Sequence, residues 1–268
     1  MHTEPAATET ADVSAAMEES GVLPRALWPR VDHLVTEDDT PVDNLFSAKQ
    51  QRLLVDALYS SWVTMTARSF LADANVGVFS IAEQPAIVPD VFVSMDVQPH
   101  EGWWDAFERS YFVWDYGKPP DVVIEIVSNP RGHEADDKLR RYAWMHVPYY
   151  VIFDPNRQVV DEVVRIYRLH GATYERWESG WLPEIGLGLR LWTGRFEERE
   201  ATWLRWCDED GTLIPTGAER AQQERERAQQ AEERAEQERE RAEQERERAE
   251  RLAARLRALG IDPDTIER

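Results

Sequence analysis

The chain has 268 residues, 42% of them hydrophobic, which suffices for one globular core of about 200 residues and an appendage. Its formal net charge of −20 argues against a broadly basic surface for nucleic acids, and no apolar run approaches the roughly 20 residues that span a bilayer. A single cysteine, Cys207, excludes an intramolecular disulfide framework and a cysteine-rich zinc site and favours a cytoplasmic location.

Residues 1–23 are acidic and lack a signal-peptide pattern, so they are predicted to form a disordered leader. Residues 24–215 are expected to form one domain that begins with an amphipathic helix over residues 43–63. The elements expected after it are strands at 76–81, 87–94 and 121–127, a helix at 134–146, a strand at 149–153, a hairpin of 163–169 with 172–177, and strands at 182–191 and 201–206. This order predicts an α/β core in which helices flank a mixed sheet.

The last part of the chain, residues 216–268, is dominated by a charged repeat. Residues 219–259 contain 11 arginines and 12 glutamates, so nearly all of the net charge lies elsewhere. Alanine recurs every seven residues from Ala221, but the second apolar position of each heptad is mostly glutamate. The repeat therefore predicts a long helix, either single or in a coiled coil that would make the chain a homo-oligomer. Leu252, Leu256 and Leu259 form its one stripe of large apolar residues.

A buried acid is the main candidate for a functional residue. In residues 121–127 alternate side chains share a face, and Glu125 has almost only apolar neighbours. Its carboxylate needs a partner or a metal to be tolerated there. Asp90 stands at the start of a second apolar strand, and Lys138 lies near the edge of the apolar stripe of the following helix. Two acids on neighbouring strands with a lysine above them suit metal-assisted hydrolysis.

Simpler roles exist for each of these residues. Glu125 could be a structural acid paired with Lys138 or an arginine, and Asp90 could be a turn residue after proline. Lys138 could be an ordinary exposed lysine of its helix. Tyr142 is interpreted as a core residue. The tryptophan-rich stretch 103–114 could stack on bases, but core packing or a lid is the preferred interpretation.

Four motifs in this order resemble the Uma-two family of putative restriction endonucleases, within the PD-(D/E)XK nuclease superfamily. They are VPDVFV (88–93), WDYGKPPDVVIEIVS (114–128), the E-x-x-x-K-x-x-x-Y helix (Glu134, Lys138, Tyr142) and VPYYVIFDP (147–155). The resemblance covers roughly residues 41–215 and implies a restriction-endonuclease-like fold that hydrolyses phosphodiester bonds in DNA with Mg²⁺, for which Mn²⁺ could substitute.

The resemblance also implies roles for single residues. Asp90 falls on the first metal-binding acid and Glu125 on the second, with the backbone carbonyl of Ile126 as a further ligand. The superfamily's usual lysine position is Val127 here, and Lys138 matches a lysine that the helix supplies instead.

Two positions depart from the family pattern. Glu134 stands where an aspartate is common, and the first helix carries Ser47 and Gln50 where a histidine or acid is frequent, so that Asp43 is the nearest acid. The alternative is therefore a catalytically inactive nuclease fold that binds nucleic acid or protein and self-associates through its helical tail.

Overall fold

The computed structural model describes residues 27–28, 45–99, 109–127, 133–159 and 161–259, without the side chains of residues 133–136. The predicted leader, Asp43 and the side chain of Glu134 lie outside the described residues. The chain divides into two units, residues 1–216 and 217–268.

The first unit is built around a six-stranded sheet with the strand order β1-β3-β5-β6-β7-β8. Strands β5 and β6 are parallel, and all other neighbours in this sheet are antiparallel. Its strands are β1 (Phe70–Asp73), β3 (Val91–Met95), β5 (Val122–Ile126), β6 (Tyr149–Phe153), β7 (Val164–His170) and β8 (Thr173–Arg176). The predicted mixed sheet is confirmed.

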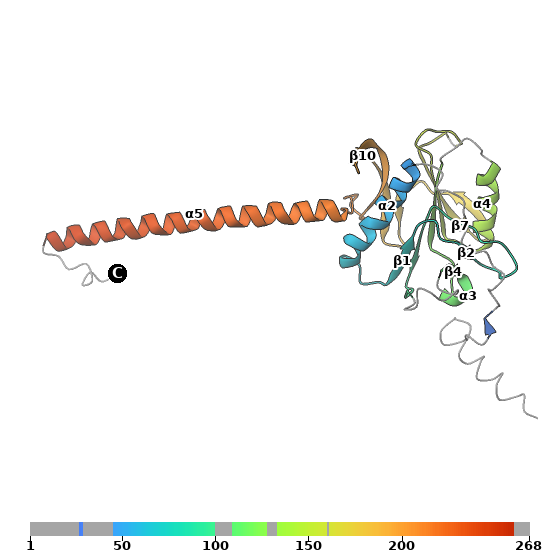
Figure 1. Cartoon of the computed structure of the whole chain (residues 1–268), viewed down its shortest axis with the longest axis horizontal. Coiled ribbons are helices and arrows are strands. Elements are labelled where there is room, and N and C mark those ends of the chain that lie inside the picture. The colour runs from blue at the N-terminus through green and yellow to red at the C-terminus, as the bar shows by residue number, and fades with distance from the viewer. Residues whose placement is uncertain (1–26, 29–44, 100–108, 128–132, 160, 260–268) are drawn as a thin grey trace, which may run out of the picture. The chain divides into compact units, whose positions relative to one another are not determined.

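The two faces of this sheet are covered by different elements (Figure 1). One face packs against helix α2 (Leu45–Ser60) and a three-stranded sheet of β9 (Trp181–Leu182), β10 (Leu187–Phe196) and β11 (Arg199–Cys207). The other face packs against helix α4 (His133–Trp144) and a parallel pair of β2 (Val78–Phe79) and β4 (Tyr111–Phe112). Two short helices, η2 (Trp62–Thr64) and α3 (Val113–Tyr116), complete this unit. Flanking helices on a mixed sheet confirm the predicted fold class.

Helix α4 lies where it does because it connects two parallel strands. A parallel pair such as β5 and β6 needs a crossover, and α4 supplies it across one face of the sheet. The helix ends in a Schellman motif, in which His146 adopts a left-handed φ of 60°. The N–H of His146 donates to the Ala143 carbonyl and that of Val147 to the Tyr142 carbonyl. These bonds fix the last turn of α4 directly before β6.

Helix α2 is joined to the smaller sheet by buried hydrogen bonds. The Gln50 side chain donates to the Leu204 carbonyl at 2.7 Å and accepts from the Leu204 N–H at 3.0 Å. The indole N–H of Trp206 donates to the Leu54 carbonyl at 2.9 Å. The smaller sheet therefore serves as a support for α2.

Several boundaries differ from those the sequence predicted. Strand β1 was not predicted, because four residues are too few to show a strand period. The strand expected at residues 182–191 is divided, since a turn with Gly186 at a φ of 78° separates β9 from β10. By contrast, the strand expected at residues 149–153 has the same bounds as β6.

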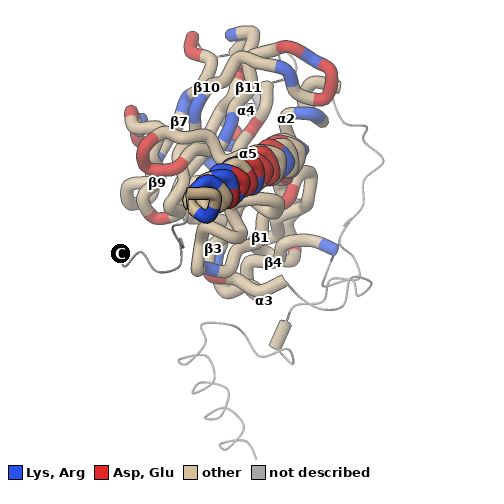
Figure 2. The backbone as a smooth tube through the Cα atoms, turned by 90° about the vertical axis from the view of Figure 1, so that its left-hand side faces the viewer, with Lys and Arg blue, Asp and Glu red and all other residues tan. Residues whose placement is uncertain are grey.

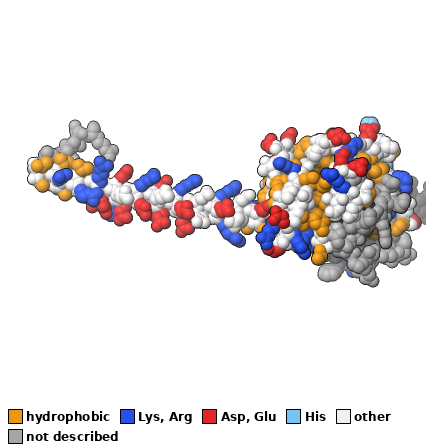
Figure 3. Space-filling model, turned by 90° about the horizontal axis from the view of Figure 1, so that it is seen from above, with side chains coloured by type: hydrophobic (Ala, Val, Ile, Leu, Met, Phe, Trp, Pro, Cys, Tyr) orange, Lys and Arg blue, Asp and Glu red, His pale blue; other side chains and the backbone are white. Residues whose placement is uncertain are grey.

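The second unit is helix α5 (Gly217–Ala258), which has 42 residues and no buried side chain. Acidic and basic residues follow one another along it (Figure 2), and pairs such as Arg220–Glu224 and Arg246–Glu250 join consecutive turns. Apolar side chains gather at its C-terminal end (Figure 3). No helix among the described residues combines the length and the apolar character needed to cross a membrane.

Removal of residues 217–268 is expected to leave the melting temperature of the α/β unit unchanged, because α5 buries no side chain. The cut belongs after Thr216, which is itself buried. Differential scanning calorimetry of the full and shortened chains measures this. Any self-association should disappear when Leu252, Leu256 and Leu259 are changed to alanine, as sedimentation velocity would show. Unfolding of the shortened chain would contradict the separation of the two units.

Candidate active site

The register of two antiparallel strands places two acids opposite each other. Val91 of β3 pairs with Ile124 of β5, so the next position along this register joins Asp90 and Glu125. Residues directly opposite in an antiparallel pair point to the same face of the sheet. Their neighbours Phe92 and Val123 belong to the apolar cluster under α4. Glu125 therefore faces the α4 side, and Asp90, which directly precedes β3, lies at the same end of this strand pair.

The Glu125 carboxylate is held by two side chains of α4. The Lys138 ammonium donates to Oε2 at 2.6 Å, and the Tyr142 hydroxyl donates to Oε1 at 2.7 Å. Lys138 and Tyr142 are four residues apart and so lie on the same face of the helix. Glu125 is only 8% exposed, so these bonds replace most of its hydration.

Burial controls the protonation of Glu125. Its pKa is raised to about 7, chiefly because burial disfavours the charged form; the Lys138 ammonium opposes this rise and the nearby Asp90 adds to it. Burial also holds the pKa of Tyr142 well above its usual value, with the Glu125 charge as the next cause. The phenol therefore remains a hydrogen-bond donor at neutral pH.

Asp90 is held by a backbone N–H and by helix α2. Its Oδ2 accepts from the Ile126 N–H at 2.6 Å, and its Oδ1 accepts from the Gln51 side chain at 3.0 Å. The N–H and C=O of one strand residue point to the same side of the strand, so the Ile126 carbonyl also faces the Asp90 side. Asp90, Glu125, Lys138 and the Ile126 backbone are thus brought together.

Gln51 and Asn75 are members of the cluster that the sequence did not reveal. Gln51 is buried and exchanges hydrogen bonds of 3.2 Å and 3.0 Å with Asn75, whose own backbone N–H donates to the Asp90 carbonyl at 3.3 Å. Asn75 has a left-handed φ of 56°, which asparagine tolerates better than most residues.

The residue of α2 that reaches the acids is therefore Gln51, and Gln50, which stands where the family pattern often has a histidine or acid, binds β11 instead. Consecutive helix residues point about 100° apart, so Gln50 faces β11 when Gln51 faces Asp90. The sequence signal for a site residue on α2 is a polar side chain on the sheet-facing side of an amphipathic helix. Both Gln50 and Gln51 show this signal. Tyr142 was interpreted as a core residue; it is fully buried and also binds Glu125.

Other acids near these strands have structural partners. Asp121 accepts from the Met95 N–H at 2.7 Å and pairs with Lys118 at 2.5 Å, away from Glu125. Asp154, at the end of β6, accepts from the Val159 N–H at 2.6 Å and so stabilises a turn. Within the described part of the chain, no group of three or more His, Cys, Asp or Glu side chains is arranged to hold a metal ion.

This fold and cluster define an α/β protein whose buried acid, lysine and tyrosine lie between a mixed sheet and its crossover helix. Residues 37–193 match the Uma2 family, described as putative restriction endonuclease. The match covers more than half of the chain, so the chain belongs to the Uma2 family, as its motifs predicted. Membership of this family supports a nuclease-like function.

A solved structure is also similar. It is the crystal structure of a putative nuclease belonging to DUF820 from Anabaena variabilis ATCC 29413. The sequence identity is 15%, the match covers 55% of this chain and 73% of that chain, and the TM-score is 0.34. No curated protein matches the chain significantly.

The Glu125→Gln variant is expected to be more stable than the natural protein above pH 7 and about equally stable at pH 4. A folded-state pKa raised from 4.5 to about 7 gives a contribution that is fully present below pH 4.5 and is lost as the pH rises through 7. Glutamine can still accept from Tyr142, while the Lys138 side chain, 31% exposed, can turn to water. The gain should be roughly 1–3 kcal/mol at pH 8, measured by urea denaturation at both pH values.

Glu184→Gln is the control with the opposite sign. Burial raises the pKa of Glu184, but the hydrogen bond from Tyr149 and the charge of Arg168 outweigh it, so the pKa is lowered. This contribution is present above the ordinary glutamate pKa, and the control should therefore lose stability at pH 8. A loss for Glu125→Gln at pH 8 as well would contradict the assignment of an uncompensated burial cost to Glu125.

Proposed function

We propose that this chain is a Mg²⁺-dependent endodeoxyribonuclease that hydrolyses phosphodiester bonds in DNA, with Asp90, Glu125 and Lys138 as its catalytic residues. The observation that carries the proposal is the pair of acids placed opposite each other at the ends of β3 and β5, with the Lys138 ammonium 2.6 Å from one of them. The residues that the motif resemblance singles out are the ones this geometry brings together.

The oxygen atoms of the cluster suit a hard divalent cation. Mg²⁺ is usually bound through one or two carboxylates together with waters and substrate phosphates, so two acids are a sufficient protein donor set. Asp90, Glu125 and the Ile126 carbonyl would hold it, and Mn²⁺ accepts the same ligands. When bound, the cation would polarise the phosphate and lower the pKa of a coordinated water. Its charge would also offset the burial cost that raises the pKa of Glu125.

Lys138 is placed to act on the water or the phosphate. Its ammonium binds Glu125 in this structure, and the side chain is 31% exposed, so it can rotate toward a bound phosphodiester. There it would orient the attacking water and offset charge on the phosphate oxygens. The water oxygen forms the new bond to phosphorus, the bridging P–O bond breaks, and the leaving oxygen takes up a proton.

The remaining members of the cluster are positioning residues. Tyr142 binds Oε1 of Glu125 and thereby fixes the plane of the carboxylate. Gln51 binds Oδ1 of Asp90 and is itself held by Asn75. Both acids are therefore oriented before any substrate arrives, which is the condition for effective electrostatic catalysis.

Purified full-length protein is expected to nick supercoiled plasmid with Mg²⁺ or Mn²⁺ and to lose this activity with a chelator. Asp90→Asn, Glu125→Gln and Lys138→Ala should each lower the rate by at least about 100-fold, because each removes a charge acting at the reacting phosphate. Lys49→Ala is the matched control: Lys49 pairs with Glu197 at 2.6 Å and touches none of the three residues.

Two results would reject the proposal. One is a natural protein that binds DNA or another protein without cutting, which would leave the non-catalytic binding module. The other is full activity in the purified, folded Glu125→Gln variant.

Cation affinity is expected to rise with pH through about 7, because Glu125 must lose its proton to bind a cation. Titration of Mn²⁺, followed by electron paramagnetic resonance between pH 5.5 and 8.5, measures this independently of cleavage. Glu125→Gln should bind more weakly and show no such rise. Equal pH dependence in the variant and the natural protein would show that another group controls the site.

A further inference from the structure

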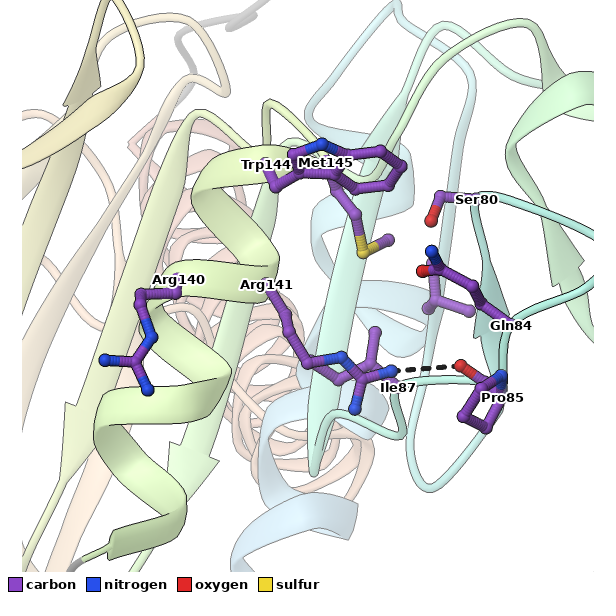
Figure 4. A pocket seen from close by; sticks show the side chains of 9 residues that line it. Ser80, Gln84, Pro85, Ile87, Arg140, Arg141, Trp144 and Met145 are labelled. Carbon is purple, nitrogen blue, oxygen red and sulfur yellow. Dashed lines mark hydrogen bonds between the residues drawn. The ribbon is translucent and has the colours of Figure 1, made fainter.

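A hollow of about 380 Å³ lies beside the candidate active site, between α4 and the segment that joins β2 to β3 (Figure 4). Trp144 and Met145 form one side of it and the loop of Ser80 and Gln84 forms the other, while Arg141 reaches across toward Pro85. The hollow is lined by Val78, Ser80, Gln84, Pro85, Ile87, Arg140, Arg141, Trp144 and Met145. Its size falls in the range of small-molecule binding sites.

The lining is basic although the chain is strongly acidic. It contains no acid, in a chain with 51 acidic and 31 basic residues, and of its two arginines Arg141 points into it whereas Arg140 points away (Figure 4). Arg141 is three residues after Lys138, so the two side chains lie on neighbouring parts of one helix face. The nearest acid of α4 among the described side chains is Asp137, whose contact with Arg140 is long, at 3.5 Å, and exposed. The hollow thus suits an anionic ligand next to Lys138.

Arg141 is held in place with donors to spare. Its Nη2 donates to the carbonyls of Pro85 and Ala86 at 2.9 Å and 3.2 Å. Within the described residues, its Nε and Nη1 have no protein acceptor and no acid pairs with it. A guanidinium fixed in this way can present its remaining N–H groups to a phosphate oxygen.

Trp144 supplies an exposed aromatic surface at the same place. It is 56% exposed at the last position of α4, whereas its neighbour Met145 is buried. The exposed indole therefore offers a ring face to a ligand in the hollow. An indole face stacks on any nucleobase, and the Gln84 amide across the hollow can bond to a base edge.

A second hollow, of about 440 Å³, borders the other side of Trp144 and Arg140. The rest of its lining comes from residues such as Ala143, Ala172 and Thr173 and includes no other arginine. Of these two hollows, only the first combines a fixed guanidinium, an aromatic face and an amide opposite it.

Resting on the proposed function, we propose that the first hollow binds one unpaired nucleotide of the DNA strand next to the cleaved bond. The base stacks on Trp144 above Met145, Gln84 contacts its edge, and Arg141 binds the adjoining phosphate. A base inside a duplex does not offer its face to a side chain, so the nucleotide must be in a single strand or turned out of the helix.

The test uses full-length protein in the presence of a chelator, so that binding is measured without cleavage. The probe is a short single-stranded DNA with one 2-aminopurine, whose fluorescence falls when it stacks on an aromatic ring, and the same sequence in a duplex. Trp144→Ala should weaken single-strand binding at least about fivefold, from the cost of losing one base–aromatic stack. It should also abolish the quenching. Trp144→Phe should retain both the single-strand affinity and the quenching. Arg141→Ala should lower the affinity and make it less dependent on salt concentration.

Two variants serve as controls, and each is used once its melting temperature is shown to equal that of the natural protein. Leu191→Ala removes another exposed apolar side chain, and Arg195→Ala removes an exposed arginine of the β10–β11 hairpin. Both should leave affinity and quenching unchanged. The inference is overturned if Trp144→Ala binds as tightly as the natural protein, or if it alters only the oligomeric state, which would make this face a protein contact.

The plasmid assay separates failure of this inference from failure of the proposed function. Cleavage by the natural protein combined with unchanged binding by Trp144→Ala rejects the nucleotide site and keeps the nuclease. Quenching that depends on Trp144, without any metal-dependent cleavage, supports the nucleotide site and rejects the nuclease.

Discussion

One buried carboxylate determines how helix α4 is oriented on the sheet. Glu125 lies near the end of the central strand β5 under α4, where an unpaired charge would be costly, and the helix supplies both of its partners. These two bonds fix the orientation of α4 about its own axis. The Schellman motif at His146 fixes the end of the same helix. Replacing a buried ion pair by apolar side chains of similar volume often stabilises a protein. The presence of Glu125 and Lys138 is therefore better explained by chemistry than by stability.

Asp90 extends this constraint to the other layer of the fold. One carboxylate oxygen binds the Ile126 N–H of the neighbouring strand, and the other binds Gln51 of α2. Gln50, the adjacent residue, ties α2 to β11. Through two consecutive glutamines, α2 is thus fixed to the smaller sheet on one side and to the acid cluster on another. The cluster lies where three separately anchored elements meet, which keeps its members oriented in the absence of ligand.

The strand that carries Glu125 and the helix that carries Lys138 could be predicted because each has a clear apolar period and a strongly apolar neighbour. The roles of Gln51 and Tyr142 could not. Helical periodicity shows that Gln50 and Gln51 both border the apolar face of α2, but only the packing of β11 decides which of them reaches Asp90. Tyr142 follows the pattern of a core residue and occupies a core position; its hydroxyl becomes important only because Glu125 lies above it. Strand β1 is recognisable by its pairing with β3 and not by its own four residues.

The protein is strongly acidic, yet its proposed substrate, DNA, is a polyanion. Two carboxylates close together repel a phosphate, and a chain with a net charge of −20 adds to this repulsion. Exposed charges farther apart than a Debye length of about 8 Å are largely screened at physiological salt, so the groups around the phosphate dominate. There Lys138 already balances Glu125, and the hollow beside it is lined by Arg140 and Arg141 without an acid. A divalent cation on Asp90 and Glu125 would leave the site net positive. An acidic protein can therefore bind a polyanion here, because Lys138, Arg140 and Arg141 place positive charge in the C-terminal part of α4, which contains no acid.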